Sequence, residues 1–306
     1  MDITVVGAGV IGLTVARALE QRGHVVQVIG AARPEATTSA VAGAVWFPFH
    51  AGESPEVAAW ALRTRAALDA LADDPETGVD RLTFYECTDD ATPPWWADSS
   101  VVRDRAPVAG APEAWRFTAP RVEPARFLPW LERQLARPIA IATIADVRAL
   151  PGDRVIVCAG LGARALVGDA GVGAVLGQVV VVEPGTIPLD ISFTDDRGRA
   201  PIFYSIPRRA EVVLGGLVRP HDADLPAPEP DPAITQRILA QCRALGWEPG
   251  AIRAVRTGLR PVRAAPRLAR DPDDPRVIHA YGHGGAGYTL CLAVAEDVAA
   301  LVDASA

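Results

Sequence analysis

A glycine-rich run near the N-terminus has the spacing GxGxxG that is typical of dinucleotide-binding loops. It follows an apolar run at residues 3–7 and opens a helical pattern at residues 10–22, which is the context that this function requires. The first glycine permits a tight turn, the second lets the backbone approach a pyrophosphate, and the third lets the helix pack on the sheet. A glycine-rich turn without a ligand is the alternative. The residues expected to hold a dinucleotide are Gly7, Ala8, Gly9, Val10, Ile11 and Gly12.

A second candidate binding segment, TTSAVAGAVWFPF, spans residues 37–49. Its hydroxyl groups can donate hydrogen bonds to phosphate, and its small residues leave the backbone bare enough to lie against a flat ring. The alternative is an ordinary helix cap followed by a helix. The residues expected to contact the cofactor are Thr37, Thr38, Ser39, Gly43, Ala44 and Val45.

The end of the second strand leaves the identity of the dinucleotide open. An acidic residue that binds a ribose is usual there, but residues 29–33 read IGAAR. Arg33 is able to meet a 2′-phosphate, which would favour NADP. It is equally well interpreted as a solvated surface arginine, so this residue alone decides nothing.

Glycines gather again near the C-terminus, where residues 279–289 read HAYGHGGAGYT and a helix follows. Backbone N–H groups at the start of a helix stabilise negative charge on a bound ring or phosphate. A tight connection without a ligand is the alternative. Further cofactor contacts are therefore predicted at Gly284, Gly285, Gly287, Tyr288 and Thr289.

The elements that position these segments follow from hydrophobic periodicity. Residues 3–7, 10–22 and 25–29 predict a β-α-β unit with a parallel strand pair. Further strands are expected at 153–158, 176–183, 211–217 and 276–280, and further helices at 56–74, 125–136, 233–245 and 288–302. Residues 89–124 show little periodicity, and the proline-rich stretch 220–232 reads as a loop. The result is an α/β nucleotide-binding fold with a second domain inserted between its pieces.

Composition excludes several classes of protein. The 306 residues carry a net charge of −7, which argues against a nucleic-acid partner. All 30 basic residues are arginine, so neither a Schiff-base lysine nor a P-loop lysine is available. The four cysteines lack metal-ligand spacing, and we expect no metal site. No signal peptide or membrane span is recognisable, which favours a cytoplasmic protein. A homodimer and pairing of Cys242 with Cys291 stay open, with free thiols as the default.

Taken together, the segments resemble the D-amino acid oxidase family of flavin-dependent amine oxidases. The similarity covers VVGAGVIGL, TTSAVAGAVW, VIVCAGLGARAL, GQVVVVE, FYSIPR, VVLGG, TGLRPVR and YGHGGAGYT, in family order over nearly the whole chain. The resemblance implies FAD as cofactor, in a Rossmann-like FAD-binding domain formed by residues 1–50, 140–175 and 256–306. An interleaved α+β substrate-binding domain, built on an antiparallel sheet, would comprise residues 51–139 and 176–255.

The resemblance also implies a substrate site. Arg260, in TGLRPVR, would form a two-point salt bridge with the substrate carboxylate, which a guanidinium fork suits. Tyr204, in FYSIPR, would bind the same carboxylate, and the carbonyl of Gly285 would receive the amine. The implied activity is oxidative deamination of D-amino acids, with neutral side chains preferred, by hydride transfer to FAD. Its products are 2-oxo acids, ammonia and, from molecular oxygen, hydrogen peroxide. No base is then needed at the α-carbon, so His279 and His283 are interpreted as structural.

Two departures from the family bear on specificity. The family's lid tyrosine corresponds to Ala200, and Phe47 replaces a residue that is polar in some members. We therefore expect tolerance of bulky apolar side chains and poor activity on D-aspartate. Arg197 and Arg199 lie near the lid and keep a D-aspartate oxidase open, as does a glycine oxidase on the same scaffold. An NADP-dependent reductase using Arg33 and a flavin-bound module without turnover stay open as well.

Overall fold

The computed structural model describes residues 1–48, 54–98, 101–106, 113–198 and 201–304. The strands are β1 (Asp2–Val6), β2 (Val25–Gly30), β3 (Val79–Cys87), β4 (Val102–Asp104), β5 (Ala114–Val122), β6 (Ala140–Ile141), β7 (Arg154–Val157), β8 (Gly173–Val182), β9 (Ile191–Asp195), β10 (Phe203–Pro207), β11 (Val212–Gly215), β12 (Arg219–His221), β13 (Ile252–Arg270) and β14 (Val277–His283). The helices are α1 (Val10–Gln21), α2 (Thr38–Val41), α3 (Pro55–Leu71), α4 (Pro124–Arg133), α5 (Ala163–Leu166), α6 (Pro232–Ala244) and α7 (Gly287–Asp303). Short 3₁₀ turns are η1 (Pro34–Ala36), η2 (Pro75–Thr77), η3 (Val147–Ala149) and η4 (Gly160–Gly162).

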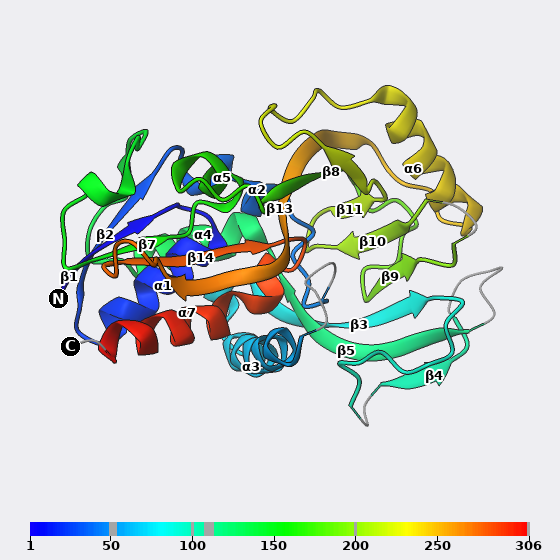
Figure 1. Ribbon diagram of the computed structural model, residues 1–306. Helices are drawn as coiled ribbons and strands as arrows, with labels where there is room; N and C mark the ends of the chain where they lie inside the picture. The colour runs from blue at the N-terminus through cyan, green and yellow to red at the C-terminus, as the bar shows by residue number, and fades with distance from the viewer. Residues whose placement is uncertain (49–53, 99–100, 107–112, 199–200, 305–306) are drawn as a thin grey trace.

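One end of the sheet is the predicted nucleotide-binding fold. β1 pairs in parallel with β2 on one side and β7 on the other, and β7 pairs in parallel with β14. The buried apolar face of α1 packs against this sheet, and α7 lies beside α1 although the two helices come from opposite ends of the chain (Figure 1). The predicted β-α-β unit is therefore confirmed.

The other end of the sheet is mostly antiparallel. β9, β10, β11 and β8 follow one another as antiparallel neighbours, and α6 covers one face of them (Figure 1). β3 extends this sheet beyond β9 in parallel, and β5 and β4 complete that edge. The predicted fold class, an α/β nucleotide-binding part joined to an antiparallel sheet, is confirmed.

The strand β13 joins the two parts into one sheet. Its first half pairs with β8 and its second half with β14, with a register shift between Val262 and Arg267. Prolines at 261 and 266 obscure this strand in the sequence, because proline is rare inside sheets. Pro261 has no N–H to donate, but its carbonyl accepts a hydrogen bond from the backbone N–H of Gly284 at 2.9 Å.

Two proline-rich segments contain strands that periodicity does not reveal, and the loop expected at 220–232 is wrong for its first two residues. Residues 89–124 contain β4 and the nine-residue β5, whose side chains from Trp115 to Ala119 alternate between buried and at least partly exposed. The stretch 220–232 begins inside β12, which pairs with β8. Pairing with neighbouring strands from distant parts of the chain overrides weak local preference in both cases. We keep the two-domain division as a proposal, which the change from parallel to antiparallel pairing at β13 supports.

The four cysteines are free and buried. Burial raises the pKa of Cys87 to about 11 and the pKa values of Cys242 and Cys291 to about 12, and it raises the pKa of Cys158 as well. Cys242 and Cys291 belong to different core clusters, so their thiols are not placed to form a disulfide. Among the described residues, no helix combines the length and apolar composition needed to cross a bilayer.

The packing of α1 gives a test of this core. Leu13 on α1 is fully buried in the core cluster that also contains residues of the sheet and of α7. Leu62 on α3 is 46% exposed. Leu13→Ala should lower the free energy of unfolding by about 2–5 kcal/mol, because it leaves a cavity. Leu62→Ala, the matched control, should change it by less than about 0.5 kcal/mol. Urea unfolding measures both, and equal losses would contradict the assigned packing.

Candidate active site

A cavity of about 690 Å³ lies at the carboxyl ends of β1, β2, β7 and β14 and extends along one face of the antiparallel strands. The carboxyl edge of a parallel sheet is where open α/β folds bind their ligands. Segments from the N-terminus, the middle and the C-terminus of the chain line this one cavity. A site of this kind can hold a large cofactor and a small substrate together.

The first glycine loop is built for close approach. Gly7 has φ +120, and a Cβ on it would lie 2.3 Å from the carbonyl oxygen of Cys158 on the neighbouring strand segment. A Cβ on Gly12 would lie 1.9 Å from the carbonyl oxygen of Gly7, so α1 starts directly against its own loop. These positions therefore admit only glycine. The first N–H groups of α1, which lack intrahelical partners, lie at the cavity.

The segment 37–45 lines the cavity beside this loop and contains the short helix α2. Thr37 donates its hydroxyl hydrogen to the Pro34 carbonyl at 2.7 Å, and Thr38 donates to the Leu259 carbonyl at 3.3 Å. The hydroxyl of Ser39 instead accepts the backbone N–H of Val10 at 3.0 Å, which leaves its own hydrogen to be donated. Of the three hydroxyls, Ser39 is the one best placed to contact a phosphate.

The C-terminal glycine loop closes the cavity from the other side. Gly284 has φ +57, and its N–H donates to the Pro261 carbonyl, which ties the loop to the residue after Arg260. The Tyr288 hydroxyl donates to the Ser39 carbonyl at 3.0 Å and so joins both cofactor segments. Hydrogen bonds thus fix three separate stretches of chain around one space.

Almost all of the site residues predicted from the sequence line this cavity. The exceptions are Gly12, Thr289 and Arg33. Gly12 packs under the loop, and Thr289 donates to the Phe47 carbonyl at 2.8 Å. The Arg33 guanidinium lies 2.7 Å from Glu132, its side chain is 51% exposed, and it is absent from the residues that line the cavity. Contact of Arg33 with the cofactor stays a prediction, which this position does not favour. Ala200 and Arg199 lie outside the described residues.

Two glycines that the sequence analysis missed make room for the predicted substrate-binding side chains. A Cβ on Gly177 in β8 would lie 2.7 Å from both terminal nitrogens of Arg260, which projects from the neighbouring β13. A Cβ on Gly215 in β11 would lie 2.2 Å from the hydroxyl oxygen of Tyr204, its register partner in β10. The guanidinium and the phenol thus lie flat over bare backbone. Gly177 and Gly215 are recognisable as part of the site only once the pairing of these strands is known, and the sequence alone does not show that pairing.

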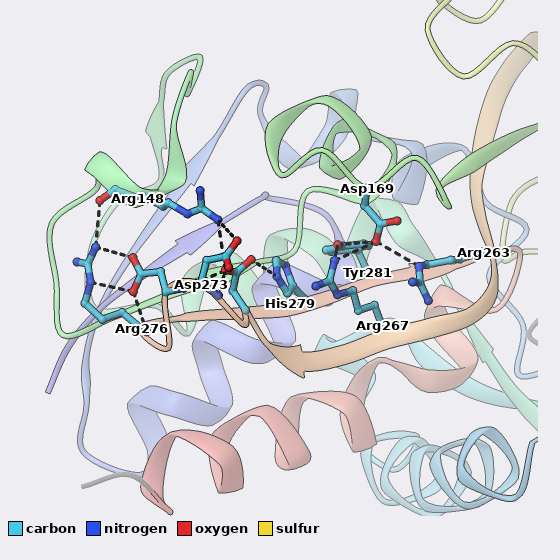
Figure 2. Close-up of polar contacts among 10 residues, drawn as sticks. Arg148, Asp169, Arg263, Arg267, Asp273, Arg276, His279 and Tyr281 are labelled. Carbon is cyan, nitrogen blue, oxygen red and sulfur yellow. Dashed lines mark hydrogen bonds and ion pairs between the residues drawn. The ribbon is translucent and has the colours of Figure 1, made fainter.

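A polar network at β13 and β14 holds the other arginine of TGLRPVR (Figure 2). The Asp169 carboxylate accepts bonds from Tyr281 at 2.9 Å and from Arg263 and Arg267 at 3.2 Å each. Burial acts to raise the pKa of Asp169, but these donors outweigh it and hold the pKa below its usual range. Arg263 is absent from the residues that line the cavity. The network therefore fastens β13 to β14 next to the start of the glycine loop.

His283 lines the cavity and is fully buried within its wall. Burial lowers its pKa to about 4, so its imidazole is neutral near pH 7 and is a weak proton acceptor. This environment supports its interpretation as a structural residue. His279 lies 3.0 Å from Asp271, in the continuation of the network that Figure 2 shows.

Glu86 is a lining residue that the sequence analysis did not single out. It stands on β3, inside the stretch between predicted motifs, and one of its carboxylate oxygens is buried. Burial, with a smaller contribution from Asp196, raises its pKa from 4.5 to about 7. An acidic residue in a strand gives no chemical signal until the fold shows that it faces a cavity.

The residues present fit FAD. The close-approach glycines leave a cradle at the start of α1 that side chains would fill, and Ser39 and the start of α7 add donors beside it. The small residues Gly43, Ala44 and Val45 line the same cavity and leave its wall flat. The fold and this cavity together define a flavin-dependent oxidoreductase.

Comparison with known proteins agrees with this class. The family model described as FAD dependent oxidoreductase matches residues 2–301, and the chain belongs to that family. It is 36% identical to a D-amino-acid oxidase from Rubrobacter xylanophilus, over 98% of this chain and 95% of that protein. It is also 36% identical to a D-amino-acid oxidase from Streptomyces coelicolor, over 98% and 96%. Glycine oxidase from Bacillus cereus shares the fold with a TM-score of 0.81 at 19% identity, covering 100% of this chain and 95% of that one.

Cofactor binding can be tested at Gly9. Its backbone is extended, so valine fits the local conformation, but its Cβ would lie 3.1 Å from the Ser39 oxygen at the cradle. Gly9→Val should therefore yield folded protein that purifies with little flavin, measured by absorbance after denaturation. Gly173→Val is the control, because the nearest atom to its Cβ is 3.5 Å away and the residue is outside the cavity wall. Full flavin content in Gly9→Val would indicate that the phosphate site does not lie at this loop.

The raised pKa of Glu86 predicts a pH-dependent stability. The unfolded chain releases this proton near pH 4.5 and the folded chain near pH 7, so the stability falls as the pH rises through that interval. By pH 8 the loss amounts to at most about 3 kcal/mol. Glu86→Gln should thus raise the Tm at pH 8 and change it little at pH 4. Glu113→Gln, at a side chain that is 63% exposed, removes the same charge and should show no such difference.

Proposed function

We propose that this enzyme catalyses the oxidative deamination of D-amino acids to 2-oxo acids and ammonia, with molecular oxygen as the final acceptor. The observation that carries the proposal is the placement of Arg260 and Tyr204 over bare backbone glycines in the same cavity as the FAD cradle. A guanidinium fork and a phenol hydroxyl are suited to a carboxylate. Two relatives at 36% identity, both named D-amino-acid oxidases, support this choice of substrate.

The substrate carboxylate would bind between the Arg260 guanidinium and the Tyr204 hydroxyl. Arg260 also donates to the Leu217 carbonyl at 3.2 Å, which orients its planar group. The apolar side chains of Val179, Ile202 and Ile206 line the same region and exclude water. In such surroundings a charge-assisted hydrogen bond is stronger than in water. This part of the chain therefore orients the substrate rather than reacting with it.

The amine would point at the carbonyl of Gly285, in the glycine loop that is hydrogen-bonded to the residue after Arg260. FAD, when bound, supplies the acceptor for the α-hydrogen and its electron pair, and returns the electrons to oxygen as hydrogen peroxide. The carboxylate, the amine and the side chain are then fixed at three points. Three fixed points direct the α-hydrogen toward the cofactor in one enantiomer alone. The imino acid that leaves reacts with water to give the 2-oxo acid and ammonia.

Three competing functions receive less support from the described residues. A D-aspartate oxidase needs a second cation for the side-chain carboxylate, but the Arg197 guanidinium forms two bonds with Asp195, at 2.7 and 2.6 Å. An NADP-dependent reductase needs Arg33, which pairs with Glu132 outside the cavity. A passive flavin module has no need of an arginine and a tyrosine converging beside the cofactor. We also keep a cytoplasmic location and a homodimer as proposals; buried free thiols fit a reducing compartment.

A panel of amino acids tests the substrate class. Hydrogen peroxide release should be detected with D-enantiomers and fall by at least 100-fold with the L-enantiomers of the same residues. The kcat/KM for D-aspartate should be lower than for every neutral D-amino acid, because Glu86 adds negative charge to the wall and Arg197 is already paired. A preference for glycine or for D-aspartate over all neutral D-amino acids would contradict the proposal.

Variants at the two motif arginines test the site. Arg260→Ala removes the carboxylate's partner from an apolar cavity, a loss of about 3–5 kcal/mol, so kcat/KM should fall by about 10²–10³-fold or more. Arg260→Lys restores the charge without the fork and should recover only part of this loss. Arg263→Ala is the control, because Arg263 pairs with Asp169 outside the cavity-lining residues. Equal effects of the two alanine variants, or full activity of the first, would place the carboxylate elsewhere. Flavin content should stay near normal in all three.

A further inference from the structure

One carboxylate in the cavity wall has no part in the chemistry proposed above. Glu86 lines the cavity, and its Oε2 atom is buried and accepts no hydrogen bond from any residue that the structure describes. A buried charge is unfavourable unless a cation or donors compensate it. The missing partner can therefore come from a ligand that enters the cavity.

The sheet register places Glu86 in line with the carboxylate-binding residues. Glu86 on β3 is the register partner of Thr194 on β9, and Thr194 is the partner of Tyr204 on β10. Tyr204 in turn is paired with Gly215 on β11, over which its ring lies. Register partners in adjacent strands face the same side of a sheet. Glu86, Thr194 and Tyr204 accordingly all line the cavity, in one row across the sheet.

The length of this row matches a long amino acid. Three strand spacings separate Gly215 from Glu86, which is about 14 Å. Hydrogen bonds of about 2.9 Å at each end leave about 8 Å between a carboxylate oxygen and the terminal nitrogen of the ligand. About seven zigzag bonds of about 1.5 Å span that length, as from a carboxylate oxygen to the terminal nitrogen of an extended lysine, and an arginine is about one bond longer. A substrate carboxylate at Tyr204 thus brings a terminal cation of such a side chain to Glu86.

The neighbouring charges leave this position acidic. Arg103 on β4 is the cation that acts on Glu86. Its guanidinium lies over the Trp115 ring, 4.9 Å from the centroid, its Nε is 3.5 Å from Glu113, and one terminal nitrogen donates to the Thr88 carbonyl at 3.4 Å. Its other terminal nitrogen, like Glu86 Oε2, is buried and has no hydrogen-bond partner among the described residues. Asp196, just after β9, acts on Glu86 as a second negative charge. The register partners Trp115 and Thr194 carry no charge, and across the cavity Tyr204 and Arg260 are committed to the other end of the substrate.

We propose that Glu86 determines specificity by binding a cationic group at the far end of the substrate side chain, so that D-lysine and D-arginine are preferred over neutral D-amino acids of the same length. This inference rests on the proposed function. It refines the substrate class and replaces the preference for neutral side chains that the family resemblance implies. Because the pKa of Glu86 is about 7, its carboxyl keeps its proton in more acidic solution and then accepts neutral side chains. The preference for a cation should consequently grow as the pH rises.

The experiment compares D-lysine with D-norleucine, which lacks only the terminal ammonium group. In the wild-type holoenzyme at pH 8.5, kcat/KM for D-lysine should exceed that for D-norleucine by about tenfold or more, and the ratio should decline below pH 7. In Glu86→Gln the ratio should fall at least tenfold and lose its pH dependence, with D-norleucine turnover rising. The matched control is Glu113→Gln, which removes an exposed carboxylate that also contacts Arg103 and should keep the wild-type ratio.

Three results would contradict this inference. A wild-type preference for D-norleucine at pH 8.5, or an equal change in both substrates on Glu86→Gln, would overturn the role of Glu86 while D-amino acid oxidation stands. A Tm of Glu86→Gln below that of the wild type at pH 8 would indicate that the Glu86 carboxylate is stabilised by Arg103. This result would overturn the role of Glu86 in substrate binding as well. Absence of peroxide from every D-amino acid, with flavin fully bound, would overturn the proposed function and this inference together.

Discussion

The backbone ladder of β13 is the constraint on which the site depends. This strand is hydrogen-bonded to β8 along its first half and to β14 along its second, so it belongs to both parts of the sheet. Arg260 lies just before the point at which the partner of β13 changes from β8 to β14. The carbonyl of the next residue, Pro261, accepts a hydrogen bond from the N–H of Gly284 in the C-terminal glycine loop. The side chain that would hold the substrate and the loop that would face the cofactor are therefore attached to one continuous piece of backbone. Asp169, bound to Arg263, Arg267 and Tyr281, holds β13 and β14 together at this junction.

The cavity is shaped as much by missing side chains as by present ones. Bare backbone at Gly177 and Gly215 lets a guanidinium and a phenol lie against the sheet instead of standing up from it. The glycines at the start of α1 do the same for a cofactor on the other side. Polar groups thus reach a largely apolar space at few, fixed points, which is how a site binds a zwitterion without filling with water. We infer that Glu86, the acidic residue in the cavity wall, then sets the specificity for the substrate side chain.

The sequence predicted well what is local and poorly what is paired at a distance. The loop at residues 7–12, the flanking β-α-β unit and the C-terminal glycines were recognisable because turn, helix start and strand lie within a short stretch. Arg260 and Tyr204 were identified through a family resemblance, not through periodicity. The strand β5 and the role of Gly177, Gly215 and Glu86 could not be predicted, because each depends on which strand lies next to it. Arg33 illustrates the converse, since its position near a cofactor motif gave no information about its partner Glu132.

The burial of the thiols has a consequence for an enzyme that releases peroxide into its own interior. Cys158 lines the cavity, and the other three cysteines are buried in the hydrophobic core clusters. Peroxide attacks the thiolate and not the thiol, and burial keeps all four in the thiol form at neutral pH. The chain also contains a single methionine, at its first position. The protein interior thus offers its own oxidant few sulfur atoms to modify, which favours a long working life under sustained turnover.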